Sequence, residues 1–535
     1  MGQTMGKKYK TSLTRRQALA AVGATGLAGF AGCTSGGGGG GGGDVPEPST
    51  EVRSEQEGIE VWGNELNRHA REDSNTDFKQ FEGENIEINF LMGLHKYSDT
   101  TSKVKSYFED LTGITVNYNV VEEDNYWKRI RTAMRNQEQY AGYMIGNWPA
   151  AEYHEPGWAV DLNKFIENDR LTDKDWLALD DYMEQTKEFM TFPDEGGGES
   201  FIAIPNGIEI YGCVGCNRET FEQVEDVPND PTEMQTFADL ERNARLIAES
   251  DATDKQGMVS RAASATLSAA NFGTMFRSHD AKWIDREVLL NEDDPDPEDV
   301  ALVNSENGVE ALERFAGILY NYGIPEASRQ DWYGNNATYS RGDVGMIYST
   351  PQTSGLIDTE MIKKTTWVPP LQTEDGRDRV GDTWVWSTGI SSHVSEKKQE
   401  AAWLYIQWAN SRAANFLLST HQWEGDQPRA GHARYKWIFD QDMYEYPRIE
   451  GHEGYRNTFR EAWDLESGEY LVPTSPPPIP ADTPENMNIM SAVANAMSRT
   501  VANGPDRAQT ELDAIVGEVS DAAKRIPDRY IEPHV

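Results

Sequence analysis

The chain has 535 residues and carries 89 acidic against 49 basic side chains, a formal net charge of −40 at pH 7. An aromatic content of 10% excludes a disordered chain, so we expect a folded protein with an acidic surface. That charge repels itself unless salt screens it, which makes a high-salt environment and an extremely halophilic host the expected setting. Nucleic acid is excluded as a partner because the sequence has no basic stripe. A cation-binding protein would suit the charge equally well, so charge alone names no ligand.

Residues 1–33 have the order of an export signal. Arg15 and Arg16 precede an apolar, small-residue stretch at 18–31, which is shorter than the about 20 residues that a membrane span needs. The paired arginines resemble a twin-arginine signal, and the sequence Phe-Ala-Gly-Cys that ends at Cys33 resembles a lipoprotein box. We therefore predict lipidation of Cys33 and anchoring to the extracellular face of the cell membrane. An ordinary signal peptide with an incidental cysteine is the alternative.

Residues 34–80 are predicted to form a flexible tether. Eight glycines at 36–43 can pack against nothing, and the segment from Asp44 to about Asn75 is polar and rich in Glu, Ser and Pro. The folded body is therefore expected to begin near Phe81, with about 450 residues, enough for two domains.

Strands and helices are expected to alternate through this body. The sequence predicts, in chain order, a strand at 86–92, a helical stripe at 104–111 ended by Gly113, a strand at 114–120, a helical stripe at 127–134 and a strand at 143–145. Such units predict parallel sheets covered by helices, with ligands beyond the carboxyl ends of the strands. Later stripes predict helices at 240–247, 309–319, 403–408 and 512–522.

Two cysteines remain in the body, Cys213 and Cys216. The spacing could belong to a redox pair or to half a zinc site, but no further ligands follow at a suitable spacing. The segment also has the pattern of a strand, so we predict two buried core thiols. The acidic loop 291–299 lacks the glycine and final glutamate of an EF-hand and is interpreted as a solvated insertion.

Signatures of enzymes are sparse. His154-Glu155 and His452-Glu453 lack the second histidine of a zinc protease, and there is neither a nucleophile elbow nor a phosphate-binding loop. We predict no catalysis, no cofactor and no metal. A carboxylate pair for glycoside hydrolysis stays open, as does glycosylation at the sequon of Asn336.

Aromatic side chains gather instead at predicted strand ends and loops. A flat indole covers the C–H face of a sugar, while nearby polar groups bond its hydroxyls, so these residues predict a carbohydrate site. Core packing is the alternative for any single tryptophan, and we assign Trp403 and Trp408 to the core. The candidates from this pattern are His95, Tyr97, Asn147, Trp148, Trp332, Trp384, Trp386 and Trp423.

The order of several segments resembles the extracellular sugar-binding proteins of ABC importers, of the maltose-binding type. The resemblance covers about residues 86–525. It rests on LTGITVNYNVV at 111, GYMIGNWPAAEYHEPGWAVDLNKFI at 142, FIAIPNGIEIYGCVGCNRETFEQ at 201, PTEMQTFADLERNARLI at 231, YSRGDVGMIYST at 339 and EKKQEAAWLYIQWANS at 396.

The resemblance implies an α/β, two-lobed, periplasmic-binding-protein-like (type II) fold, with a parallel-type sheet flanked by helices in each lobe. Lobe 1 is expected to comprise 81–208 and about 336–383, and lobe 2 about 209–335 and 384–535. The family's ligand contacts would fall on Asn147, Trp148, Glu209, Arg261, Trp384, Trp386, Trp423 and Arg429. Arg261 departs from the family pattern because Ala262 follows it in place of glycine.

The implied function is capture of a sugar, oligosaccharide or polyol between the lobes and its delivery to ABC permease subunits. We expect a monomer. A secreted polysaccharide-degrading enzyme, a binding protein for another solute and a surface adhesion protein are the alternatives.

Overall fold

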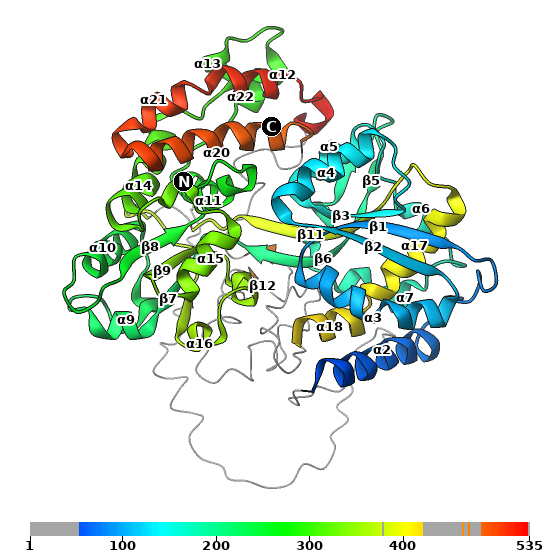
Figure 1. Ribbon diagram of the computed structural model, residues 1–535. Coiled ribbons are helices and arrows are strands. Elements are labelled where there is room, and N and C mark those ends of the chain that lie inside the picture. The colour runs from blue at the N-terminus through cyan, green and yellow to red at the C-terminus, as the bar shows by residue number, and fades with distance from the viewer. Residues whose placement is uncertain (1–52, 377–378, 421–462, 465–468, 471–482, 533–535) are drawn as a thin grey trace, which may run out of the picture. The chain divides into compact units, whose positions relative to one another are not determined.

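The computed structural model describes residues 53–376, 379–420, 463–464, 469–470 and 483–532, in which two main sheets dominate (Figure 1). Cys33, Trp423 and Arg429 lie outside these ranges, as do the paired arginines at 15–16 and the pair His452-Glu453. None of the helices in the described ranges has the length and apolar character needed to cross a bilayer.

The larger sheet has five strands. In spatial order they are β2 (Thr115–Val121), β1 (Glu87–Gly93), β3 (Gly142–Gly146), β11 (Thr383–Ile390) and β6 (Ala203–Ile210). β1 pairs in parallel with β2 and β3, whereas β11 runs antiparallel to both β3 and β6. Every residue of the central strands β3 and β11 is buried, as expected for strands covered on both faces, and so is every residue of the edge strand β6.

The smaller sheet has four strands. In spatial order they are β10 (Thr365–Val368), β7 (Cys213–Asn217), β9 (Val344–Ser349) and β8 (Gln256–Ser260). Only β8 and β9 are parallel, because a helical crossover joins them; β7 runs antiparallel to β9 and β10. The expected α/β fold is confirmed, but both sheets are mixed.

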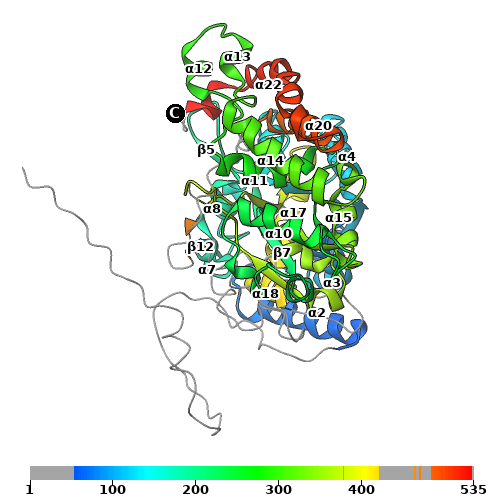
Figure 2. The same ribbon diagram turned by 90° about the vertical axis from the view of Figure 1, so that its left-hand side faces the viewer.

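Helices pack on both sheets. Those that accompany the five-stranded sheet are α2 (Glu55–Glu72), α3 (Lys96–Thr112), α4 (Glu123–Arg135), α5 (Asn147–His154), α17 (Glu396–Ala409) and α18 (Arg412–Thr420). Those that accompany the four-stranded sheet are α9 (Arg218–Gln223), α10 (Phe237–Ala248), α11 (Ala269–Ser278), α14 (Glu306–Tyr322), α15 (Trp332–Ser340), α20 (Asn486–Asn503), α21 (Ala508–Asp513) and α22 (Val516–Ala523). Figure 2 shows α14, α11 and α10 on the side that faces the viewer, and α14 and α10 contact β8.

Short elements fill the connections. They are α6 (Asn163–Ile166), α7 (Lys174–Leu177), α8 (Glu184–Glu188), α12 (Arg286–Asn291), α13 (Pro297–Val300), α16 (Thr359–Ile362), and the two-stranded pairs β4 (Thr191–Pro193) with β5 (Glu199–Phe201) and β12 (Trp463–Asp464) with β13 (Glu469–Tyr470).

Local signals explain the element boundaries. His95 caps the start of α3 by accepting a hydrogen bond from the Tyr97 amide, and Gly113 ends the helix in the left-handed conformation with φ 74°. The strands and helices predicted between residues 86 and 145 are confirmed, although α3 begins eight residues and α4 four residues before the stripes that predicted them. The predicted helix at 512–522 is divided between α21 and α22.

The body begins earlier than predicted, because α2 lies within the expected tether. Ser54 and Glu57 form a capping box at its start, and Trp62, Leu66 and Ala70 recur at helical spacing on a buried face. The Asn67 amide donates to the Tyr107 carbonyl and accepts from the Trp408 indole. The polar composition concealed this stripe, so the tether prediction is wrong for residues 55–72.

The expected lobe boundaries are also wrong for the middle of the chain. β9 and β10 pair with β7 and β8, whereas β11 pairs with β3 and β6. Segment 344–368 therefore belongs with the four-stranded sheet, and 383–409 with the five-stranded sheet. The reason is that the chain changes sheets after β10, at residues 369–382, and not before β9. We call the two sheets with their helices the five-stranded half and the four-stranded half.

Two connections between the halves run side by side, and a third, from α18 to α20, passes mostly through residues outside the described ranges. Tyr211 and Gly212 join β6 to β7, and the Tyr211 amide donates to the carbonyl of Asp382, directly before β11. Gly212 has φ +92°, and a Cβ there would lie 2.3 Å from Cγ2 of Thr274. This crossing point therefore accepts only glycine at position 212.

We predict that Gly212→Ala lowers the free energy of unfolding by roughly 2–4 kcal/mol, because it adds backbone strain to a steric clash. Denaturant titration in concentrated salt would measure the change. Adding Thr274→Ser should restore part of the loss by removing Cγ2. Gly517→Ala, in α22 with open space around its Cβ position, is the control and should be neutral or stabilising. Equal effects of the two alanines would contradict the prediction.

Candidate functional site

A pocket lies beside these two neighbouring connections, and both halves contribute to its walls. The space within it, including the part open to solvent, is about 470 Å³, within the range of about 300–1,000 Å³ for small-molecule sites. The five-stranded half and the crossing supply Gly93, Leu94, His95, Glu123, Tyr126, Trp148, Glu209, Tyr211, Trp384 and Trp386, and the four-stranded half supplies Leu267, Trp332 and Tyr333.

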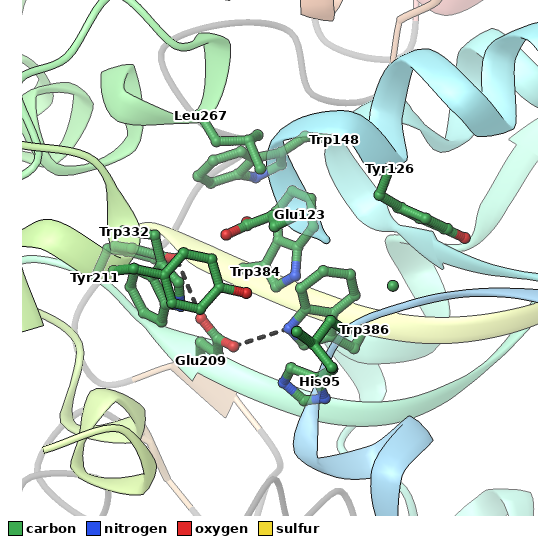
Figure 3. A pocket seen from close by; sticks show the side chains of 13 residues that line it. His95, Glu123, Tyr126, Trp148, Glu209, Tyr211, Leu267, Trp332, Trp384 and Trp386 are labelled. Atoms are coloured by element: carbon green, nitrogen blue, oxygen red, sulfur yellow. Dashed lines mark hydrogen bonds between the residues drawn. The ribbon is translucent and has the colours of Figure 1, made fainter. Parts of the chain in front are cut away.

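The carboxylate of Glu209 is the polar centre of the pocket (Figure 3). It lies at the end of β6 and is 3% exposed. The Trp386 indole donates to its Oε1 at 2.8 Å, and the Tyr211 hydroxyl donates to Oε2 at 3.1 Å. Burial raises the pKa of Glu209 to about 7, against these two hydrogen bonds, and the nearby Glu123 carboxylate adds to the rise.

Four indoles form the apolar wall. Trp384 meets Trp386 edge to face, with ring centroids 4.9 Å apart, and meets Trp148 in the same way at 4.9 Å. Trp127, from the first turn of α4, stacks behind Trp386 at 5.8 Å. Because neighbouring ring planes lie at 76° and 85°, the wall is a right-angled corner and not a flat platform. Such a corner can hold the carbon chain of a compact ligand.

The backbone of β11 is fixed from the side of β3. The Asn147 amide donates to the Thr383 carbonyl at 3.1 Å, and its oxygen accepts from the Val385 amide at 2.9 Å. The Trp148 indole also donates to Thr383, at 3.1 Å. Trp384 lies against Gly146, where a Cβ would come within 2.1 Å of the indole. Asn147 and Gly146 therefore orient the wall without lining the pocket.

Three buried donors at the site have no hydrogen-bond partner among the described residues. They are Nε1 of Trp127, Nε1 of Trp384 and Nε of Arg261, and the last two residues are each 2% exposed. Arg261 follows β8, and its guanidinium lies over the ring of Trp332, 5.1 Å from the centroid. Its Nη2 is 4.0 Å from Oε1 of Glu123. A buried donor without a partner destabilises the site unless a ligand or water accepts from it.

The structure brings together part of the predicted ligand set. His95, Trp148, Glu209, Trp332, Trp384 and Trp386 line the pocket, and their role in binding stays a prediction. Asn147 holds β11, Arg261 stands behind Trp332, and Tyr97 is buried at the start of α3 without lining the pocket.

Sequence reasoning missed several residues of the wall. Glu123 and Tyr126 lie in the first turn of α4. The start of a helix directly after the strand β2 was the signal that could have indicated them. Tyr211 precedes the strand predicted around Cys213 and Cys216, and no pattern in the sequence marks it as a site residue. Leu267 belongs to a short 3-10 turn, Thr266–Ser268, which has no marked pattern.

The remaining motifs have structural explanations. Cys213 and Cys216 are buried in β7, as predicted, and burial raises the pKa of the Cys216 thiol. The Asn336 side chain is 1% exposed and donates to the Trp332 carbonyl, so the folded chain does not present it for glycosylation. Within the described ranges, no group of three or more His, Cys, Asp or Glu side chains could hold a metal ion.

Comparison with known proteins assigns the family. A family model, bacterial extracellular solute-binding protein, matches residues 97–416, which is more than half of the chain. The chain belongs to this family. The prediction of a solute-binding protein is confirmed at that level, and the family description indicates an exported protein.

A relative of this solute-binding protein is an erythritol/L-threitol-binding protein of Mycolicibacterium smegmatis. It is 23% identical over 335 residues, 61% of this chain and 66% of that protein, so the match leaves about a third of the relative uncovered. Two ABC transporter solute-binding proteins share the fold with a TM-score of 0.63. One, from Agrobacterium radiobacter with ribitol, is 16% identical and aligned over 82% of this chain and 98% of its own. The other, from Agrobacterium vitis with D-mannitol, is 19% identical over 82% and 99%.

The maltose-binding type is also represented. A maltose-bound MalE3 of T. maritima aligns with a TM-score of 0.61 at 14% identity, over 81% of this chain and 99% of its own. The type II fold expected from the sequence is therefore confirmed.

We predict that Glu209→Gln changes how the stability of this solute-binding protein depends on pH. The folded pKa of Glu209, about 7, lies above the ordinary value of 4.5, so ionisation costs stability as pH rises from about 4.5 through about 7. The charged or titratable groups near it are Glu123, Arg261, Tyr211 and His95.

The wild type should therefore lose up to about 3 kcal/mol relative to the glutamine variant between pH 5 and pH 8. Denaturant unfolding at the two pH values measures this difference. Glu360→Gln, which alters an exposed carboxylate, serves as the control. Parallel pH profiles of wild type and Glu209→Gln would contradict the assignment.

Proposed function

We propose that the protein captures a polyol or sugar in the pocket between its two halves and presents it to the permease of an ABC importer. The observation that carries this proposal is the pocket itself, in which an indole corner encloses a buried carboxylate and walls come from both halves. Indoles cover C–H surface, while Glu209 accepts from hydroxyls. Relatives and neighbours named for erythritol, ribitol, mannitol and maltose support this class of ligand.

Binding would favour closure of the two halves. A ligand shifts such an equilibrium only by contacting one state better than the other. Residues from both halves line the pocket, so a ligand that contacts Glu209 and Trp332 together can contact them fully only when the halves approach. The closed form is then the signal that the permease recognises.

We propose binding without turnover. Glu123 and Glu209 are the residue types that glycoside hydrolysis uses, which keeps a polysaccharide-degrading enzyme as the alternative. In favour of binding, both oxygens of Glu209 already accept hydrogen bonds from neighbouring side chains. The chain also belongs to a family of solute-binding proteins. Release of reducing ends from a polymer, lost in Glu209→Gln, would favour the enzyme instead.

We predict that a polyol or sugar raises the melting temperature in concentrated salt, because it binds the folded state alone. The screen comprises erythritol, ribitol, D-mannitol, glucose and maltose. Trp386→Phe should weaken binding of the active compound at least about tenfold, since it removes the donor that orients Glu209.

The matched control is Trp403→Phe. The Trp403 indole also donates to a buried side chain, Thr172, but lies in the core of α17 away from the pocket. This variant should lose stability and keep its affinity. A flat response of the wild type to the whole panel would refute the proposed ligand class, and equal losses of affinity in the two variants would refute the role of Trp386.

We further propose that export uses the paired arginines and that Cys33 carries a lipid that keeps the protein beside its permease. The residue order around positions 15–33 supports this, and the glycines at 36–43 would provide reach. Cys33→Ser should move the protein from the membrane fraction to the medium. Cys213→Ser, which alters a buried thiol of β7, should stay in the membrane fraction. Equal fractionation of the two variants would exclude the anchor.

A further inference from the structure

Two opposite charges from different halves meet at the pocket. Arg261 follows β8 in the four-stranded half, and Glu123 begins α4 in the five-stranded half. Their side chains are 3% and 13% exposed, so both charges are largely removed from water. No pattern in the sequence paired them, since 138 positions separate them.

The gap between the two side chains is the informative feature. Nη2 of Arg261 and Oε1 of Glu123 are 4.0 Å apart, beyond hydrogen-bond distance. A single oxygen can lie about 2.8 Å from each, accepting from the guanidinium and donating to the carboxylate. Only a group that both donates and accepts can do this, and a hydroxyl is such a group. The unpartnered Nε of Arg261 offers a further donor to the same ligand.

The charges around the pocket act against ionised ligands of either sign. The carboxylates of Glu123 and Glu209 line the pocket and repel an anion, whereas the guanidinium of Arg261, which stands behind the lining and 4.0 Å from Glu123, repels a cation. Aromatic walls by themselves favour cations, but the guanidinium already lies over the ring of Trp332. An uncharged ligand rich in hydroxyls satisfies all of these groups.

We propose that Glu123 and Arg261 form an interlobe pair that a ligand hydroxyl bridges, and that this pair restricts the pocket to uncharged polyhydroxy compounds. The inference rests on the proposed function and specifies the ligand class and the residues that select it. Because the pair joins the two halves, the bridging hydroxyl also couples binding to closure.

Four matched sets of compounds test the proposal in concentrated salt, where buried charges are screened far less than exposed ones. Erythritol, ribitol and D-mannitol are each compared with the aldonate and the aminoalditol of the same chain. Glucose is compared with glucuronate and glucosamine. For each set whose neutral member binds, the dissociation constants are measured by calorimetry for wild type, Glu123→Gln and Arg261→Gln.

The two variants should relax selectivity in opposite directions. Wild type should prefer the neutral compound at least about tenfold over both charged ones. Glu123→Gln should reduce the preference for the neutral compound over the anion by about tenfold, and should keep or increase the preference for the neutral compound over the cation. Arg261→Gln should reduce the preference over the cation by about tenfold and keep or increase the preference over the anion. A merely structural role would weaken all three ligands alike.

Controls separate the possible failures. Arg329→Gln and Glu326→Gln alter an exposed pair of the same types, 3.1 Å apart, and should leave selectivity unchanged. If Arg261→Gln does not fold, Arg261→Lys keeps the charge but loses Nε, and should keep discrimination against the cation while weakening the neutral ligand. If neutral compounds bind but selectivity does not shift in opposite directions, the inference fails and the proposed function stands. If no neutral compound binds wild type, both fail.

Discussion

The structure depends on one constraint, the crossing of two chain segments between the sheets at a single point. The Tyr211 amide donates to the Asp382 carbonyl there, so β6 enters β7 beside the start of β11. Glu209 and Tyr211 lie on the first segment, and Trp384 and Trp386 directly follow the second. The crossing therefore brings the carboxylate and the indole corner together, and it also joins the two halves whose closure the proposed function requires.

Burial then determines the protonation and hydrogen bonding of the Glu209 carboxylate. A carboxylate at 3% exposure is costly unless it is protonated or hydrogen-bonded, and Glu209 accepts hydrogen bonds from two neutral donors, the Trp386 indole and the Tyr211 hydroxyl. Its pKa is raised to about 7 because these two hydrogen bonds only partly offset the loss of hydration on burial. Under the proposed function, ligand hydroxyls would supply further donors to this carboxylate, so the burial that lowers the stability of the fold would favour binding.

Much of the fold could be predicted because its signals are local. Alternation and helical spacing placed β1 to β3 and the helices between them, and Gly113 marked the end of α3. Sheet membership could not be predicted in this way, because β9 and β11 are both short apolar runs and only long-range pairing separates them. For the site, tryptophans next to strands were detectable, whereas the partnership of Glu123 with Arg261 depends on tertiary distance alone.

The distribution of unpartnered donors connects stability with function. The described residues leave Nε1 of Trp384 and Nε of Arg261 buried without acceptors, one on each half. Each such donor costs about 1–3 kcal/mol unless an acceptor reaches it. Under the proposed function, a ligand that offers acceptors to both donors has to contact both halves at once. Such a ligand favours closure to the extent that it satisfies the two donors better in the closed arrangement.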